Sequence, residues 1–204
     1  MIHTRVLLFC FVIAAGATAQ KRDSLAIKIG QMIMIGFPGS QVDSLVLQEV
    51  AAGKAGAVIF FEKNIPPTNS YNGLKKIIWS YKKAATIPLL VAIDQEGGKV
   101  NRLKEKYGFP RSVSATQLGK YPLDSVQFYA ESLAGNLAGL GFNINFAPVV
   151  DLKINPTNTA IVRPERPFAK DPDSVVLYAR EYIKAHRKIG VLTSLKHFPG
   201  HGSS

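Results

Sequence analysis

The strongest constraint on the fold of this chain is a repeated alternation of short apolar runs with longer amphipathic stretches. The apolar runs resemble strands buried on both faces, and they occupy residues 32–37, 57–61, 89–94, 144–149 and 191–196. Between them, apolar positions recur at helical spacing in residues 43–52, 71–85, 123–140 and 173–189. Strands that return through a helix pair in parallel, so the pattern predicts an α/β protein with five strands.

Two architectures are built from such units, an open doubly wound sheet and a closed (β/α)8 barrel. A complete barrel needs about 250 residues, whereas this chain has 204 residues and reaches five predicted strands. Only residues 197–204 follow the fifth strand, which leaves no helix to cover it. We therefore expect a truncated (β/α)8 TIM-barrel type fold in which this chain covers about the first five βα units. A complete five-stranded open sheet is the alternative.

The N-terminal residues have the pattern of a targeting segment. Arg5 supplies a positive charge, residues 6–15 are continuously apolar, and small residues at 17–19 form an A-x-A cleavage site. The apolar run is too short to span a bilayer. We interpret residues 1–19 as a signal peptide and residues 20–204 as the mature domain. The mature protein is expected to be periplasmic or extracellular, with no membrane span.

Charge and cysteine content limit the partners and the chemistry. The chain carries 25 Lys and Arg against 14 Asp and Glu, a formal net charge of +11, which attracts polyanions. The basic residues are dispersed and no nucleic-acid motif appears, so a nucleic-acid partner is not expected. Anionic cell-envelope polymers, or a solvated surface without a partner, are the remaining interpretations. The only cysteine, Cys10, lies in the predicted signal peptide, which excludes disulfides from the mature chain.

Polar residues gather where the predicted strands end. Asp94 and Glu96 follow the third strand, Asp151 follows the fourth, and Lys196 and His197 follow the fifth. Parallel α/β folds place their active sites at the carboxyl ends of their strands. The sequence therefore predicts a polar pocket at this edge.

Asp94 and Glu96 are two positions apart, so strand alternation would point both side chains in the same direction. Retaining glycosidases also use two carboxylates, about 5–5.5 Å apart, but these act on opposite sides of the scissile bond. Two carboxylates at one strand end would face one side of a substrate. We therefore interpret Asp94 as an acceptor of hydrogen bonds from sugar hydroxyls, and Glu96 as a buried partner for an arginine or a backbone amide.

The second dense segment reads KHFPGHG at residues 196–202. Pro199 and Gly200 separate its two histidines, so the histidines cannot share a helical face. No cysteine or third nearby histidine completes a metal site, and neither a metal nor a cofactor is expected. His186, in the helix before the fifth strand, is assigned a surface or packing role.

Five segments carry a resemblance to a known family. In chain order they are IGQMIMIGF at 29–37, IDQEGG at 93–98 with Val100 and Arg102, NFAPVVD at 145–151, RPF at 166–168, and KHFPGHG at 196–202. In this order and spacing, the chain resembles the catalytic barrel of the glycoside hydrolase family 3 β-N-acetylglucosaminidases, also called β-N-acetylhexosaminidases. The resemblance implies hydrolysis of terminal β-linked N-acetylglucosamine from cell-wall or chitin-like oligosaccharides by a retaining mechanism.

The resemblance also implies roles for particular residues. Those expected to bind the terminal sugar are Asp94, Arg102, Arg166, Lys196 and His197. Arg163 is an alternative to Arg166, because RPERPF at 163–168 departs from the family's usual pattern. The nucleophile and the acid/base are expected beyond Ser204, so no catalytic residue is assigned here and His201 is not promoted to one.

The sequence also allows two other functions. One is a non-catalytic sugar-binding protein, and the other is a β-glucosidase-like family 3 glycosidase. The expected partner is in each case a carbohydrate, and the oligomeric state is not addressed by the sequence.

Overall fold

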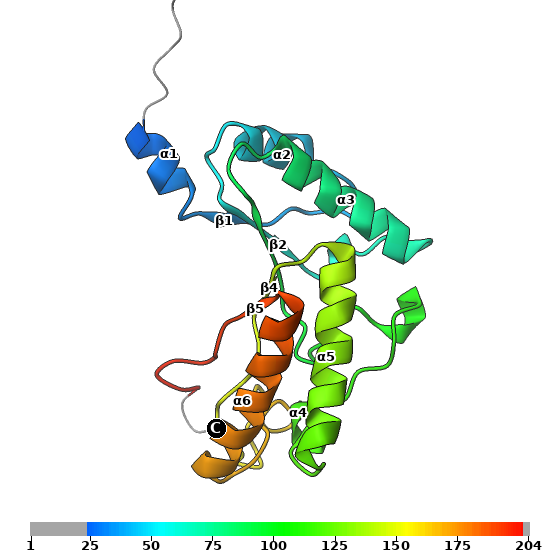
Figure 1. The fold of residues 1–204 in the computed structure, drawn as a ribbon, viewed down its shortest axis with the longest axis vertical. Helices are drawn as coiled ribbons and strands as arrows, with labels where there is room; N and C mark the ends of the chain where they lie inside the picture. The colour runs from blue at the N-terminus through cyan, green and yellow to red at the C-terminus, as the bar shows by residue number, and fades with distance from the viewer. Residues whose placement is uncertain (1–23, 202–204) are drawn as a thin grey trace, which may run out of the picture.

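The computed structural model describes residues 24–201, and its ribbon is drawn in Figure 1. The predicted signal peptide and Cys10 lie outside the described residues. Within the described part, no helix is both long enough and apolar enough to cross a membrane.

The described chain forms one parallel sheet of five strands in the order β1-β2-β3-β4-β5. The strands are β1 Met34–Ile35, β2 Ala57–Phe60, β3 Leu90–Ile93, β4 Ile144–Asn145 and β5 Leu192–Thr193. Each strand pairs with the next one in sequence, whereas doubly wound sheets reverse their strand order at a switch point. The unbroken order is that of a barrel wall, which confirms the TIM-barrel type fold and disfavours the open sheet.

All five strands are shorter than predicted, most of all β1, β4 and β5, which have two residues each. In β4 the ladder to β5 stops after Asn145, because the backbone N–H of Ala147 bonds to the carbonyl of Asn145 and not to β5. Pairing resumes as an isolated bridge between Val149 and Lys196. Before β1, the backbone N–H of Ile33 bonds to the carbonyl of Gly30 at the end of a helix, so Ile33 reaches β2 through its carbonyl alone, which accepts the N–H of Ala57.

The four predicted helices lie within one residue of their expected bounds. They are α2 Ser44–Ala51, α3 Ser70–Ala84, α5 Leu123–Leu140 and α6 Pro172–Ile189. Local signals explain the agreement, as in α6, where the Asp171 carboxylate accepts a hydrogen bond from the backbone N–H of Ser174 and Pro172 occupies the first turn. Gly190 ends α6 with a φ of 83°, which glycine adopts without steric cost.

Four further short elements had no signal in the sequence, because one or two turns are too few to show a period. They are the helices α1 Ser24–Gly30 and α4 Ala115–Leu118 and the 3-10 turns Glu62–Asn64 and Glu105–Tyr107.

Two hydrophobic clusters hold the elements together. The larger packs strands β2 and β3 against α2, α3 and α5, and its members Val58, Phe60, Val91 and Ile93 are fully buried. The second joins α4, α5 and α6, which lie side by side in Figure 1. Because helices pack over the strands, the carboxyl ends of the strands are held in fixed positions relative to one another. A binding site at that edge of the sheet needs such fixed positions.

Candidate functional site

Four of the polar residues predicted to follow the strands, Asp94, Glu96, Lys196 and His197, line one cleft, and Asp151 lies behind it. The cleft has a volume of about 490 Å3 and is lined by Asp94, Glu96, Val100, Arg102, Phe146, Arg166, Ser194, Lys196 and His197. All five residues predicted to bind a sugar are among them. They come together because β3, β4 and β5 are adjacent and parallel, so their carboxyl ends share one edge of the sheet.

A tight turn after Glu96 builds one wall of the cleft. Gly97 and Gly98 have φ values of 100° and 57°, and the carbonyl of Val100 accepts the backbone N–H of Glu96. A Cβ at Gly97 would lie 2.3 Å from the carbonyl oxygen of Val113, so only glycine fits there. The turn brings Arg102 back beside the strand end, with its Nη2 atom 3.7 Å from Oδ2 of Asp94.

Lys196 joins the two carboxylates of the third strand end. Its Nζ atom lies 2.9 Å from Oδ1 of Asp94 and also forms an ion pair with Oε1 of Glu96. Asp94 and Glu96 therefore do point the same way, as strand alternation predicts. The Asp94 side chain remains 20% exposed and that of Glu96 only 5%, so Asp94 is the carboxylate that a ligand can reach.

Glu96 is a buried partner for an arginine, as the sequence indicated. Its Oε1 and Oε2 atoms accept hydrogen bonds of 2.8 Å from Nη2 and Nε of Arg166, a bidentate pair. Burial alone would lower the pKa of Arg166, but the hydrogen bonds and the charge of Glu96 outweigh it and raise that pKa. Arg166 is thus held as a cation at the cleft wall. Arg163, the alternative, is exposed and does not line the cleft.

Asp151 orients His197 from behind the cleft. Its carboxylate, whose side chain is 1% exposed, bonds to Nδ1 of His197 and accepts the backbone N–H of His201 at 2.8 Å. Because an ionised carboxylate only accepts, Nδ1 carries the hydrogen. Nε2 is then free to accept from Nη2 of Arg166, 3.3 Å away. The histidine is therefore fixed by one partner on each ring nitrogen.

A second polar network lies behind this segment, inside the protein. Asn145 accepts the backbone N–H of Gln95 and donates to the carbonyl of Gln95 and to the hydroxyl of Tyr182. Its Nδ2 atom is also 3.2 Å from Nε2 of His186, whose Nδ1 faces the carbonyl of Tyr182 at 3.0 Å. Burial lowers the pKa of His186 to about 4 and raises that of Tyr182. This network positions the backbone between Asp94 and Glu96.

The sequence analysis did not assign roles to Asn145 or Asp151 in the site. One signal for Asn145 was present, since it interrupts the apolar run 144–149 with an amide that a buried strand must satisfy. His186 is fully buried, which agrees with its assigned packing role.

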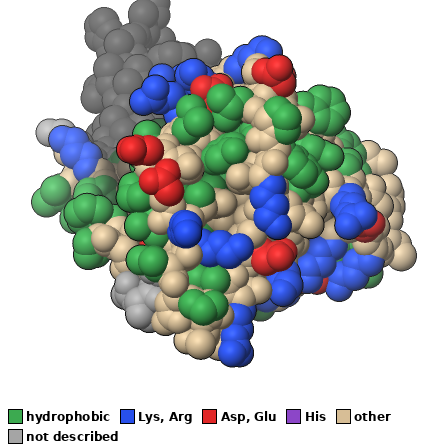
Figure 2. Space-filling model, turned by 90° about the horizontal axis from the view of Figure 1, so that it is seen from below, with side chains coloured by type: hydrophobic (Ala, Val, Ile, Leu, Met, Phe, Trp, Pro, Cys, Tyr) green, Lys and Arg blue, Asp and Glu red, His purple; other side chains and the backbone are tan. Residues whose placement is uncertain are grey.

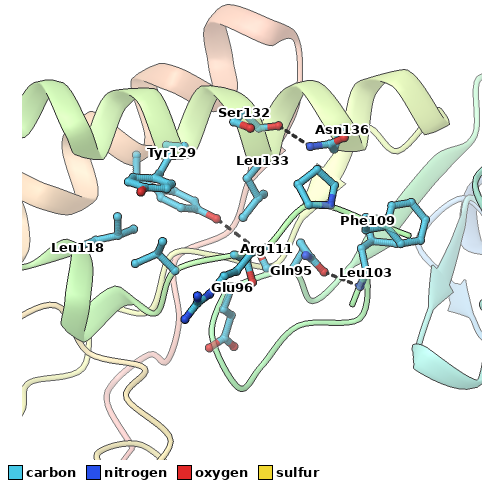
Figure 3. A pocket seen from close by; sticks show the side chains of 15 residues that line it. Gln95, Glu96, Leu103, Phe109, Arg111, Leu118, Tyr129, Ser132, Leu133 and Asn136 are labelled. Atoms are coloured by element: carbon cyan, nitrogen blue, oxygen red, sulfur yellow. Dashed lines mark hydrogen bonds between the residues drawn. The ribbon is translucent and has the colours of Figure 1, made fainter. Parts of the chain in front are cut away.

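An enclosed cavity of about 40 Å3 lies between the same segment and α5, lined by Gln95, Leu103 and Tyr129 among others (Figure 3). It has room for a few water molecules and not for a sugar ring. In Figure 3 the Glu96 carboxylate points away from α5, toward the cleft side. The open cleft is therefore the candidate for ligand binding.

Comparison with known proteins agrees with the motifs. Residues 24–204 match the family described as glycosyl hydrolase family 3 N terminal domain. The chain belongs to this family. Curated relatives of this family 3 chain include the β-hexosaminidase of Xanthomonas oryzae pv. oryzae, 30% identical over 177 residues, which are 84% of this chain and 51% of the relative. The β-hexosaminidase A of Pseudoalteromonas piscicida is 35% identical over 155 residues, 73% of this chain and 25% of the relative.

Solved structures that are similar to this chain include members of the same family. A glycoside hydrolase family 3 β-N-acetylglucosaminidase from Paenibacillus sp. superposes with a TM-score of 0.81 at 30% identity, covering 88% of this chain and 34% of that one. A β-N-acetylhexosaminidase from Beutenbergia cavernae superposes with a TM-score of 0.75 at 30% identity, covering 87% and 54%. The family 3 chain described here spans about half the length, or less, of the curated relatives that it matches.

Proposed function

We propose that this family 3 domain binds the terminal N-acetylglucosamine of β-linked cell-wall or chitin-like oligosaccharides, and that the protein containing it hydrolyses that terminal bond by a retaining mechanism. The observation that carries the proposal is the convergence of the five predicted residues Asp94, Arg102, Arg166, Lys196 and His197 on one open cleft. The names of the relatives, β-hexosaminidases and β-N-acetylglucosaminidases, support the same substrate.

The charge of the cleft suits an uncharged sugar. Its cations Arg102, Arg166 and Lys196 are balanced by three carboxylates, Asp94, Glu96 and Asp151. Such a neutral array offers both donors and acceptors to adjacent hydroxyls without attracting a net charge. In the proposed complex, Asp94 accepts from the sugar hydroxyls while Arg102, Arg166 and Lys196 donate to its oxygens.

The same geometry supports a binding role for these residues and not a role in the bond-breaking steps. Retaining hydrolysis needs one carboxylate as nucleophile and a second group that moves a proton. Asp94 and Glu96 lie on one side of the cleft and share Lys196, and Asp151 is buried behind His197. We therefore place the nucleophile and the acid/base outside residues 24–201, and expect the 204-residue chain alone to be inactive.

Binding can be tested on the chain itself by calorimetric or NMR titration with N-acetylglucosamine. Replacing Asp94 by alanine should weaken binding at least about tenfold, since a lost hydrogen bond to a charged group costs about 1.5–3 kcal/mol. The matched control is Asp124→Ala, an exposed carboxylate in the first turn of α5, which should leave affinity unchanged. Equal affinity for D94A and the wild type would remove Asp94 from the site.

Hydrolysis is tested with a chromogenic β-N-acetylglucosaminide, comparing the 204-residue chain with the longest protein that its coding region specifies. We expect turnover only from the longer protein. Binding without turnover in both would favour a non-catalytic sugar-binding protein, and preference for a β-glucoside would favour the β-glucosidase-like alternative. Turnover by the chain alone that is abolished by Glu96→Ala or His201→Ala would overturn our assignment.

Export is part of the proposal, and it is supported by the basic, apolar and small-residue pattern of residues 1–19. N-terminal sequencing of the protein from the cell envelope or medium should begin at Gln20. An intact Met1 on cytoplasmic protein would contradict it.

A further inference from the structure

Helix α3 carries an unusual surface on the side that faces away from the core. Four lysines and the only tryptophan of the chain lie in an arc of about 120° when each residue advances about 100° around the helix axis. We call this set the basic stripe, and its members are Lys75, Lys76, Trp79, Lys82 and Lys83. Trp79 is at its centre and is 65% exposed.

The lysines of the basic stripe lack acidic partners. Helix α3 contains no Asp or Glu, and none of the ion pairs formed within residues 24–201 involves these four lysines. Elsewhere helix surfaces do pair their charges, as Lys184 does with Glu181 and Lys188 with Glu131. The face drawn in Figure 2 likewise mixes basic with acidic side chains.

Helix stability does not account for the stripe. Lys82 and Lys83 lie in the last turn, where cations interact favourably with the helix dipole. Lys75 and Lys76 lie in the middle of the helix, where the helix dipole does not stabilise their charges. Lys82 is half-buried, burial lowers its pKa, and its ammonium has no hydrogen-bond partner within residues 24–201. A bound anion would offset the cost of that partly desolvated charge.

A groove adjoins the stripe and gives it a concave shape. It has a volume of about 420 Å3, and its lining includes Lys75, Lys76, Trp79 and Lys82 from α3 and Ala138, Gly139 and Gly141 from the end of α5, with no acidic residue. Gly141 leads into the start of β4, so the groove is at the opposite end of the strands from the cleft and shares no lining residue with it.

We propose that the basic stripe and its groove form a second binding site, which takes a linear acidic polysaccharide. The exposed face of Trp79 would stack on the apolar face of a sugar ring, and the lysines would pair with carboxylates along the polymer. Lysine is a compact charge on a flexible stem, which suits carboxylates at variable positions, whereas arginine forks favour phosphate. Helix α3 has no arginine, and it does not offer the succession of stacking rings that single-stranded nucleic acids use. The site is independent of the function proposed for the cleft.

Because Trp79 is the only tryptophan, its fluorescence reports on this site directly in the unmodified chain. The probe is polygalacturonate, which carries one carboxylate per ring. Titration should change the Trp79 emission, and raising salt from about 50 to about 200 mM should weaken binding strongly. The variant K75Q/K76Q/K82Q/K83Q should bind at least about tenfold more weakly, and it should fold, since lysine and glutamine have similar helix propensity.

The matched control removes the same charge elsewhere through K28Q/K120Q/K153Q/K170Q, four exposed lysines outside the stripe. It should bind polygalacturonate like the wild type, as should Asp94→Ala in the cleft. By calorimetry, Trp79→Ala should lose about tenfold in affinity, within the range for a stacking contact, and Trp79→Phe should recover part of it.

Three outcomes would overturn the proposal. Equal weakening by the two quadruple variants would mean that bulk charge alone attracts the polymer. Binding without any change in Trp79 emission would place the polymer elsewhere. A stronger response to single-stranded DNA or to anionic lipid vesicles than to polygalacturonate would assign the stripe to a different class of partner.

Discussion

Two polar networks meet at the segment that follows strand β3, and they differ in charge and in exposure. On the cleft side, Asp94 and Glu96 share Lys196, and the Asp94 carboxylate is still 20% exposed. On the inner side, Asn145 and His186 are fully buried, and the pKa of about 4 keeps His186 uncharged at neutral pH. The backbone of Gln95 lies between the two networks.

The difference follows from the cost of removing charge from water. A charge near solvent stays available to a ligand, whereas a deeply buried one would cost several kcal/mol unless paired. The inner network uses neutral groups and satisfies its hydrogen bonds internally, which is the arrangement that rigidifies a core. We therefore expect the inner network to govern stability and the cleft network to govern binding.

The largest effect on stability is expected for Asn145→Ala. The change leaves the backbone N–H of Gln95 without its buried partner and leaves the carbonyl of Gln95 with the hydroxyl of Tyr182 alone. It should lower the free energy of unfolding by about 3–4 kcal/mol in a urea titration. The control is Asn72→Ala on the exposed surface of α3, expected within about 0.5 kcal/mol of the wild type. A loss below about 1 kcal/mol for Asn145→Ala would contradict the role of the inner network.

The next effect is a pH dependence of stability that comes from His186. Its pKa is about 4 in the folded state and 6.5 in the reference state, so between these values the unfolded chain binds a proton that the folded chain does not. Stability should be complete above about pH 6.5 and fall by up to about 3 kcal/mol as pH drops to about 4. Urea titrations across this window measure it.

The variant His186→Gln should lose that pH dependence whatever its absolute stability. It should keep a separate fall in stability at lower pH, because hydrogen bonds from Lys104 and Lys106 lower the pKa of Glu62 from its ordinary 4.5 to about 2. A group with a depressed acid pKa stabilises the fold above 4.5, and the contribution is lost as pH falls toward 2. An unchanged slope between pH 6.5 and 4 in His186→Gln would assign the dependence to other groups.

A third, intermediate effect is expected for Glu96→Gln. The neutral amide cannot balance the positive charges of Arg166 and Lys196. We therefore expect about tenfold weaker binding of N-acetylglucosamine and a free energy of unfolding lower by about 2 kcal/mol. Glu131→Gln breaks an exposed ion pair with Lys188 and should cost under about 1 kcal/mol without affecting binding. Loss of stability with unchanged affinity would limit Glu96 to a structural role.

The smallest effect on stability belongs to Asp94→Ala, the variant that should impair binding. Lys196 keeps Glu96 as a partner and the site is partly open to solvent, so the free energy of unfolding should change by under about 1 kcal/mol. Thermal and urea unfolding, measured beside the sugar titration, check this. A large drop in melting temperature with affinity intact would place Asp94 in the fold and not in the site.

The helix bounds could be predicted because their signals are local. Asp171, Pro172 and Gly190 mark both ends of α6 without reference to any other element. Strand lengths could not be predicted in the same way, since a strand ends where its partner no longer offers a donor or an acceptor. Strand β4 ends at Asn145 because the N–H of Ala147 bonds to the carbonyl of Asn145, and the ladder to β5 returns only as the bridge between Val149 and Lys196.

The sequence by itself determined the parallel α/β type, the edge of the sheet where polar groups collect, and five residues that all line one cleft. The fold type and the edge follow from periodicity and from the rule that parallel strands share a carboxyl edge, whereas the five residues follow from the resemblance to glycoside hydrolase family 3. Only the tertiary structure decided which charges pair: Glu96 with Arg166, 70 residues apart, and Asp151 with His197. Pairing depends on distances set by packing between strands, and spacing along the chain does not encode those distances.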